Sequence, residues 1–155
     1  MKTSLCCDVI HKLQGKTLVT AESLTGGGIG ATLTSVSGSS AVYKGGIISY
    51  TNEVKASVLG VPKSILNSFG AVSAETAAAM VSGVRQLLNA DIAVSVTGLA
   101  GPGGDEYGNP VGTVFIGYED NSRSVVRHFV FSGDREAVRN QTVEAALTLI
   151  LQYNS

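Results

Sequence analysis

The sequence contains no tryptophan, and it has only two cysteines, two histidines and three prolines among its 155 residues. Cys6 and Cys7 are adjacent in a predicted helix, where neighbouring side chains point apart, so a disulfide between them has poor geometry. No CxxC pair or Cys/His cluster is present, and His11 and His128 alone cannot form a histidine-rich cage. We therefore expect neither a disulfide framework nor a metal site.

The charged residues show no excess of either sign. Lys and Arg number 11 and Asp and Glu number 12, so the net charge is −1, and no basic block is available to grip a nucleic-acid backbone. No apolar run approaches the length of a membrane span, and Asp8, His11 and Lys12 interrupt the core of any signal peptide. The expectation is a cytoplasmic protein that binds neither nucleic acid nor membrane.

Apolar residues make up 44% of the sequence, enough for residues 1–155 to bury a core as one domain. The predicted helices cover 2–14, 29–36, 53–59, 62–69, 73–89 and the segment after Ser132-Gly133-Asp134, and the predicted strands cover 17–21, 42–50, 91–97, 111–118 and 125–131. Asn52 is predicted to cap the third helix, and Gly45-Gly46 to mark a bulge or a close backbone approach. This order predicts an α/β three-layer sandwich, with a mixed β-sheet flanked by helices.

The stretch from Leu18 to Gly30 is the predicted reactive centre. It reads as a strand, a tight turn that carries Ser23, and a helix that begins after three glycines. Such a turn lifts the serine off the sheet edge, and the first N–H groups of the helix offer a site for an anion or an oxyanion. The glycines permit positive φ and a close approach of a ligand to the backbone.

A second glycine-rich loop, Gly98 to Gly104, also follows a predicted strand. If the two strands are parallel, both loops open on the same edge, where ligands of α/β proteins bind. Neither loop has the spacing of a nucleotide-binding fingerprint. The alternative is that these glycines only make tight connections.

A serine nucleophile needs a base. His11 is predicted to lie on a helix surface, and His128 shares a strand face with valines, which indicates a packed or rim histidine. Lysine is the other option, because a desolvated ammonium group loses its proton near neutral pH. Lys55 is the best placed lysine, just after the strand that ends at Tyr50, although a solvated surface lysine is its alternative interpretation. Tyr50 could hydrogen-bond to a ligand or stack on a ring, or it could simply pack at the edge.

Arg135 and Arg139 lie one turn apart on the last predicted helix and therefore share a face. Together they could clamp a phosphate or a carboxylate. The alternative is a surface salt-bridged to Asp134, Glu136 or Glu144.

Several separated blocks of the sequence resemble the CinA C-terminal domain, a family of nicotinamide mononucleotide deamidases. These blocks are Thr20-Ala21-Glu22-Ser23-Leu24-Thr25-Gly26-Gly27, Gly46-Ile47-Ile48-Ser49-Tyr50-Thr51-Asn52-Glu53-Val54-Lys55, Gly70-Ala71-Val72-Ser73, Gly98-Leu99-Ala100-Gly101-Pro102-Gly103-Gly104 and Pro110-Val111-Gly112-Thr113-Val114. The resemblance spans essentially the whole chain and is to the stand-alone form, without the N-terminal domain that many members carry.

The resemblance implies hydrolysis of the carboxamide of nicotinamide mononucleotide to nicotinic acid mononucleotide and ammonia, without a metal or a cofactor. It places a serine nucleophile at Ser23 and its lysine partner at Lys55, and it associates Tyr50, Arg135 and Arg139 with the pocket. The partner it implies is a small pyridine nucleotide. The apolar helices also favour a homo-oligomer. A catalytically inactive nucleotide-binding module and a protein-interaction domain are the alternative functions.

In the mechanism that we expect, neutral Lys55 takes the proton of Ser23, which attacks the amide carbonyl. Backbone N–H groups around Thr25, Gly26 and Gly27 hold the oxyanion. The second glycine-rich loop is expected to cradle the ribose phosphate together with Ser39 or Ser40, which lie between the predicted helix 29–36 and the predicted strand 42–50. The residues assigned to this cradle are Gly98, Ala100, Gly101, Ser39 and Ser40.

Overall fold

Two neighbouring inner strands of the sheet, Leu18–Glu22 and Ile92–Gly98, are buried on both faces. This explains why their sequences are nearly continuous runs of apolar and small residues. The computed structural model describes residues 2–155. Its elements, in chain order, are α1 (Lys2–Lys12), β1 (Leu18–Glu22), α2 (Gly28–Thr34), the short 3₁₀ helix η1 (Ser39–Ala41), β2 (Tyr43–Ile48), α3 (Asn52–Ser57), α4 (Lys63–Phe69), α5 (Ala74–Leu87), β3 (Ile92–Gly98), β4 (Thr113–Glu119), β5 (Ser124–Val130) and α6 (Arg135–Tyr153).

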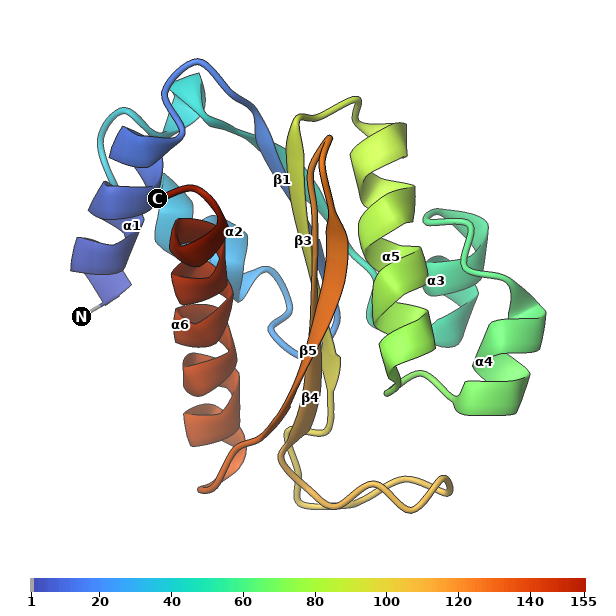
Figure 1. The fold of residues 1–155 in the computed structure, drawn as a ribbon. Coiled ribbons are helices and arrows are strands. Elements are labelled where there is room, and N and C mark those ends of the chain that lie inside the picture. Colours follow the sequence, from blue (N-terminus) through green and yellow to red (C-terminus); the bar gives the residue numbers. More distant parts are fainter. Residues whose placement is uncertain (1) are drawn as a thin grey trace.

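The five strands form one mixed sheet in the order β2-β1-β3-β4-β5. Helices α1, α2 and α6 cover one face, and α3, α4 and α5 cover the other (Figure 1). Each face has its own core of buried side chains. The predicted α/β three-layer sandwich with a mixed sheet is therefore confirmed. None of the helices in the described part of the chain combines the length and the apolar character needed to cross a bilayer.

The parallel strands β2, β1 and β3 all end at the same edge of the sheet. The turn after β1 and the glycine-rich loop after β3 therefore open side by side, as the sequence predicts. At this edge the N–H of Ser49 donates to the carbonyl of Glu22 at 2.8 Å, which ties the end of β2 to the end of β1. This edge is where the candidate site lies.

Two local predictions can be compared with the backbone. The pairing of β1 with β2 shifts at Lys44, and a Cβ on Gly46 would lie 2.4 Å from Oγ1 of Thr20, so the predicted bulge and close approach are both present. The predicted cap of α3 is wrong by one residue. Thr51, not Asn52, is the N-cap, and its hydroxyl accepts from the N–H of Val54.

A glycine in the middle of α5 sets how closely the helix approaches the segment after α3. A Cβ on Gly83 would lie 2.0 Å from the carbonyl oxygen of Leu59. The N–H of Val61, two residues further on, donates to the carbonyl of Lys55 at 3.0 Å. The contact at Gly83 therefore helps to fix the position of α3 against the sheet.

We predict that Gly83→Ala lowers the free energy of unfolding by about 2 kcal/mol, although alanine favours helix by about 1 kcal/mol over glycine. The reason is that the new methyl group meets a backbone carbonyl rather than a flexible side chain. Urea denaturation measures the change, with Gly103→Ala as the control because nothing lies within 4 Å of a Cβ there. Equal or higher stability of Gly83→Ala would contradict this packing.

Candidate active site

Ser23 occupies the turn between β1 and α2. Its N–H donates to the carbonyl of Val96 on β3 at 3.1 Å, which fixes the residue beside the next strand. The turn then reverses through Gly26 and Gly27, whose φ values of 58° and 99° lie in the left-handed region that glycine tolerates best. The Ser23 side chain is held at the sheet edge and is only 6% exposed.

Lys55 of α3 reaches the same point from 32 residues further along the chain. Its Nζ lies 3.0 Å from Oγ of Ser23. The lysine is only 1% exposed, so the alternative interpretation as a solvated surface lysine is wrong. Burial without a carboxylate partner penalises the ammonium form and lowers the pKa of Lys55 from 10.5 to about 8.

Nζ of Lys55 lies within hydrogen-bond distance of three oxygen atoms. Besides Ser23, the nitrogen donates to the carbonyls of Ser49 at 2.9 Å and Tyr50 at 3.2 Å. An ammonium group supplies one N–H to each of these three oxygens. A neutral amine keeps two N–H groups for the two carbonyls, which can only accept, and its lone pair is left for the hydroxyl of Ser23. With the amine neutral, this arrangement would allow Ser23 to give its proton to Lys55.

Glu22 organises the turn from inside, a role that the sequence analysis did not assign. Its carboxylate is 2% exposed and accepts from the N–H groups of Ile29 at 2.8 Å and Gly30 at 3.0 Å. It also accepts from the hydroxyls of Thr25 at 2.7 Å and Thr20 at 3.1 Å. The first N–H groups of α2 are thus capped by the protein's own carboxylate, and the prediction that they are free for a ligand is wrong.

The free N–H groups lie in the turn instead. Within residues 2–155, the N–H groups of Leu24, Thr25 and Gly27 have no protein partner, whereas that of Gly26 donates to the carbonyl of Ser23 at 3.1 Å. Of the predicted oxyanion donors, Thr25 and Gly27 therefore remain available and Gly26 is occupied. Leu24, which follows the serine directly, is a donor that the sequence analysis missed.

A cavity of about 290 Å³ opens onto Ser23 and Lys55. The second glycine-rich loop forms one wall through Gly98, Ala100 and Gly101, and the binding of the ribose phosphate by these residues stays a prediction. The apolar residues that line the cavity are Leu24, Ala71, Val72 and Leu99. Tyr50 lies at the mouth and is 57% exposed. Arg135 joins the two sides, because it donates to the hydroxyl of Tyr50 at 3.1 Å and to the carbonyl of Gly101 at 2.7 Å.

Arg139 lies one turn further along α6 and contacts the turn rather than this cavity. It donates to the carbonyls of Leu24 at 3.0 Å and Thr25 at 3.2 Å. The ion pairs of residues 2–155 are Arg85–Glu119 and Arg123–Asp120, so the salt-bridged surface considered for Arg135 and Arg139 is wrong.

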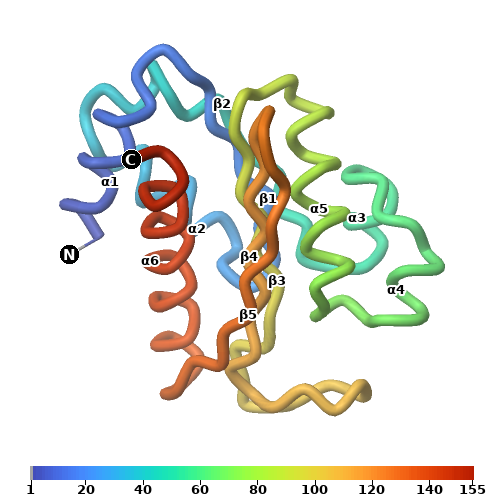
Figure 2. The backbone as a smooth tube through the Cα atoms, viewed as in Figure 1, coloured from blue at the N-terminus to red at the C-terminus, as the bar shows by residue number. Residues whose placement is uncertain are grey.

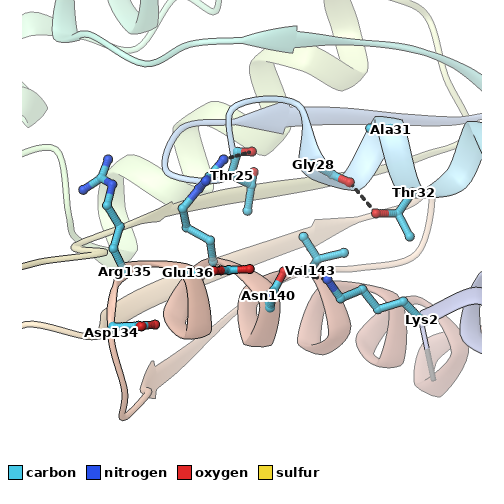
Figure 3. A pocket seen from close by; sticks show the side chains of 11 residues that line it. Lys2, Thr25, Gly28, Ala31, Thr32, Asp134, Arg135, Glu136, Asn140 and Val143 are labelled. Atoms are coloured by element: carbon cyan, nitrogen blue, oxygen red, sulfur yellow. Dashed lines mark hydrogen bonds between the residues drawn. The ribbon is translucent and has the colours of Figure 1, made fainter.

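Both arginines also line a second cavity, of about 630 Å³, between the turn, α2 and α6. Figure 3 shows Thr25 and Gly28 on one side of it and, on the other, Glu136 and Asn140 of α6 with Asp134, the residue before this helix. A clamp on a phosphate or carboxylate by the two arginines stays a prediction.

The structure does not bring Ser39 and Ser40 to the site. Both serines lie in η1, just before β2 begins. The N–H of Leu18, the first residue of β1, donates to the carbonyl of Val42, so this segment lies where β1 starts. This is the edge of the sheet opposite to Ser23, as the cyan segment in Figure 2 shows. Within this chain, the serines therefore cannot line the same pocket as the glycine-rich loop.

The histidines are accounted for outside the site. His11 is exposed on α1, and the ring of His128 stacks on Phe115 with centroids 4.5 Å apart. Both agree with the interpretation from the sequence.

Comparison with known proteins gives consistent matches along the chain. Residues 3–154 match the family model described as the CinA C-terminal domain. A protein named nicotinamide-nucleotide amidohydrolase PncC, from Pseudomonas putida, is 48% identical over 138 residues, which cover 89% of this chain and 86% of that protein.

Other relatives are longer or known as structures. A CinA-like protein from Leptospira biflexa is 46% identical over 137 residues, and the match covers 88% of this chain but 33% of that protein. The chain spans about a third of the length of several such curated relatives. The crystal structure of competence/damage inducible protein CihA from Agrobacterium tumefaciens superposes with a TM-score of 0.96 at 37% identity, covering 99% of this chain and 96% of that one.

We predict that Glu22→Gln destabilises the fold by about 2 kcal/mol or more. Each carboxylate oxygen accepts from one backbone N–H, so in either orientation the amide NH₂ of glutamine faces a donor that cannot turn away. Urea unfolding measures the loss. Glu106→Gln, in an exposed loop, is the matched control, and equal stability of the two variants would show that Glu22 does not hold the turn.

Proposed function

Because this chain belongs to the CinA C-terminal domain family, we propose that it is an amidohydrolase that converts nicotinamide mononucleotide to nicotinic acid mononucleotide and ammonia. The observation that carries the proposal is the contact of 3.0 Å between Oγ of Ser23 and Nζ of Lys55. The relative from Pseudomonas putida, whose name states this substrate class, aligns over most of its own length. A nucleotide amide is therefore the substrate that the pair would act on.

The first half of the proposed reaction forms an acyl-enzyme. Neutral Lys55 accepts the proton of the Ser23 hydroxyl, and Oγ attacks the carboxamide carbon. The carbonyl oxygen becomes negative and is stabilised by free N–H groups of the turn, such as those of Leu24 and Thr25, the first two residues after the nucleophile. The lysine then passes its proton to the departing nitrogen, the C–N bond breaks, and ammonia leaves.

The second half releases the acid. Water enters the place that ammonia left, gives a proton to Lys55 and attacks the ester carbon. The tetrahedral intermediate collapses, the C–Oγ bond breaks, and Lys55 returns the proton to Ser23. One water is consumed for each amide cleaved, and the enzyme regains its starting state without a metal or a cofactor.

The lining of the cavity suits an aromatic amide. Its walls carry small and apolar side chains, including Ala71, Val72 and Leu99, beside Ser23. The exposed ring of Tyr50 is available to stack on the pyridine, and Arg135 holds its hydroxyl at 3.1 Å. We assign the ribose phosphate to the glycine-rich loop from Gly98 to Gly104, which forms one wall of the cavity.

We predict that Ser23→Ala lowers kcat for ammonia release from nicotinamide mononucleotide by a factor of about a thousand or more. The thermal midpoint should change little, because the hydroxyl is replaced by a hydrogen in a formed pocket. Ser122→Ala, at an exposed turn, is the control and should keep full activity. Substrate-dependent thermal stabilisation of the unmodified protein without any ammonia would instead identify a binding module.

We predict that kcat/KM rises about tenfold per pH unit below pH 8 and levels off above pH 9. The reason is that only the neutral form of Lys55 accepts the serine proton, and burial lowers the pKa of this lysine to about 8. Initial rates of ammonia release between pH 6 and pH 10 measure the profile. Lys55→Arg should be inactive throughout, since arginine does not lose its proton, and a flat profile for the unmodified protein would exclude Lys55 as the base.

A further inference from the structure

The guanidinium group of Arg139 is bonded to the backbone directly after the nucleophile. Nε donates to the carbonyl of Leu24 at 3.0 Å, and one Nη donates to the carbonyl of Thr25 at 3.2 Å. The contacts join α6 to the turn across about 115 residues of sequence. Two of the three nitrogens of Arg139 are thus used on main-chain oxygens.

The geometry of the peptide bond transmits this contact to the other side of the turn. In a planar trans peptide, the carbonyl of one residue and the N–H of the next point in opposite directions. When Arg139 holds the carbonyl of Leu24 toward α6, it turns the N–H of Thr25 away from α6. That N–H is one of the three in the turn that have no protein partner within residues 2–155.

The positive charge of Arg139 also strengthens the N–H of Thr25 as a donor. A cation on the carbonyl side of a peptide polarises it, so that the N–H on the other side becomes a stronger donor. The carbonyl of Thr25 also accepts from the N–H of Gly28 at 2.9 Å, so the second peptide is held by two donors. Glu22 fixes the hydroxyl of Thr25 from the inside at 2.7 Å. Glu22 therefore holds the side chain of Thr25, and Arg139 holds the carbonyls of the peptide bonds before and after it.

We infer that Arg139 is a positioning residue, which orients and polarises the Leu24–Thr25 peptide so that the Thr25 N–H can bind the oxyanion. This inference rests on the proposed function, because it requires an oxyanion to form at Ser23. It differs from the clamp on a substrate phosphate that the sequence suggests for Arg139. A clamp acts on the binding of substrate, whereas a positioned donor acts on the transition state.

The first test separates these two roles by kinetics. With nicotinamide mononucleotide as substrate, Arg139→Ala should lower kcat about tenfold or more while KM stays within about threefold of the unmodified value. Arg139→Lys keeps the charge and should recover part of kcat, which a purely steric role would not explain. A phosphate clamp predicts the opposite split, with a raised KM and an unchanged kcat, and that result would overturn the inference.

The second test does not depend on the nucleotide. A fluorophosphonate probe reacts with an activated serine. Oγ of Ser23 attacks phosphorus, a P–O bond forms, fluoride leaves as the P–F bond breaks, and Lys55 takes the proton. The phosphoryl oxygen needs the same donors as the amide oxyanion. Labelling of Arg139→Ala should therefore be slower by about tenfold or more, and labelling of Arg139→Lys should be intermediate.

Arg127→Ala is the matched control, because Arg127 is an exposed arginine of β5 that pairs with Tyr153, away from the turn. It should be labelled at the unmodified rate. Thermal midpoints show whether each variant is folded, and Arg139→Lys serves alone if Arg139→Ala is not. Unmodified labelling rates in folded Arg139→Ala and Arg139→Lys would overturn the inference.

The outcomes for the unmodified protein distinguish the two proposals. If Ser23 is labelled but no ammonia is released from nicotinamide mononucleotide, the proposed substrate is wrong and the labelling rates still decide the role of Arg139. If Ser23 is not labelled at all, the nucleophile and the positioning role fall together.

Discussion

The candidate active site depends on one interaction, the enclosure of the Lys55 amine among three oxygens. Two of them are the carbonyls of Ser49 and Tyr50, directly after β2, and the third is the hydroxyl of Ser23, directly after β1. This geometry requires two adjacent parallel strands that end at the same level, and the bond from Ser49 to Glu22 fixes that level. Burial of a lone amine costs stability, because the ammonium form is desolvated, but it also makes the neutral form accessible near neutral pH.

The turn beside this amine is held by two charged residues of opposite sign. Glu22 accepts four hydrogen bonds from inside the turn, and Arg139 donates two from α6. Between them, the glycines supply the positive φ values that let the chain reverse within a few residues. Because the carboxylate caps α2, the N–H groups without a protein partner in residues 2–155 are found in the turn itself, next to Ser23, the proposed nucleophile. Glu22 and Arg139 therefore hold the turn in place, and a few of its backbone N–H groups stay available as donors.

Much of this could be predicted from the sequence, and the rest could not for a physical reason. The strands, the shared edge of the two glycine-rich loops and the approach of Lys55 to Ser23 follow from periodicity, turn residues and the resemblance to a family. Whether a polar side chain points inward depends on partners distant in sequence, so Glu22 was missed and the contacts of Arg139 were not foreseen. The same limit explains Ser39 and Ser40, which share the composition of a ligand loop but lie at the opposite edge of the sheet. An acidic residue at the end of an apolar strand, directly before a glycine turn, is the sequence signal that could have identified Glu22.

The most direct test of the account is a titration of the Lys55 side chain itself. The ¹³Cε chemical shift of each lysine, recorded by NMR between pH 6 and pH 12, reports its protonation, and the Lys55→Arg variant assigns the signal. We predict that Lys55 titrates with a midpoint near pH 8, because its burial lowers the pKa from 10.5 to about 8. A midpoint near 10.5 would contradict it, since the amine would then be charged near neutral pH and could not accept the proton of Ser23 in the proposed reaction.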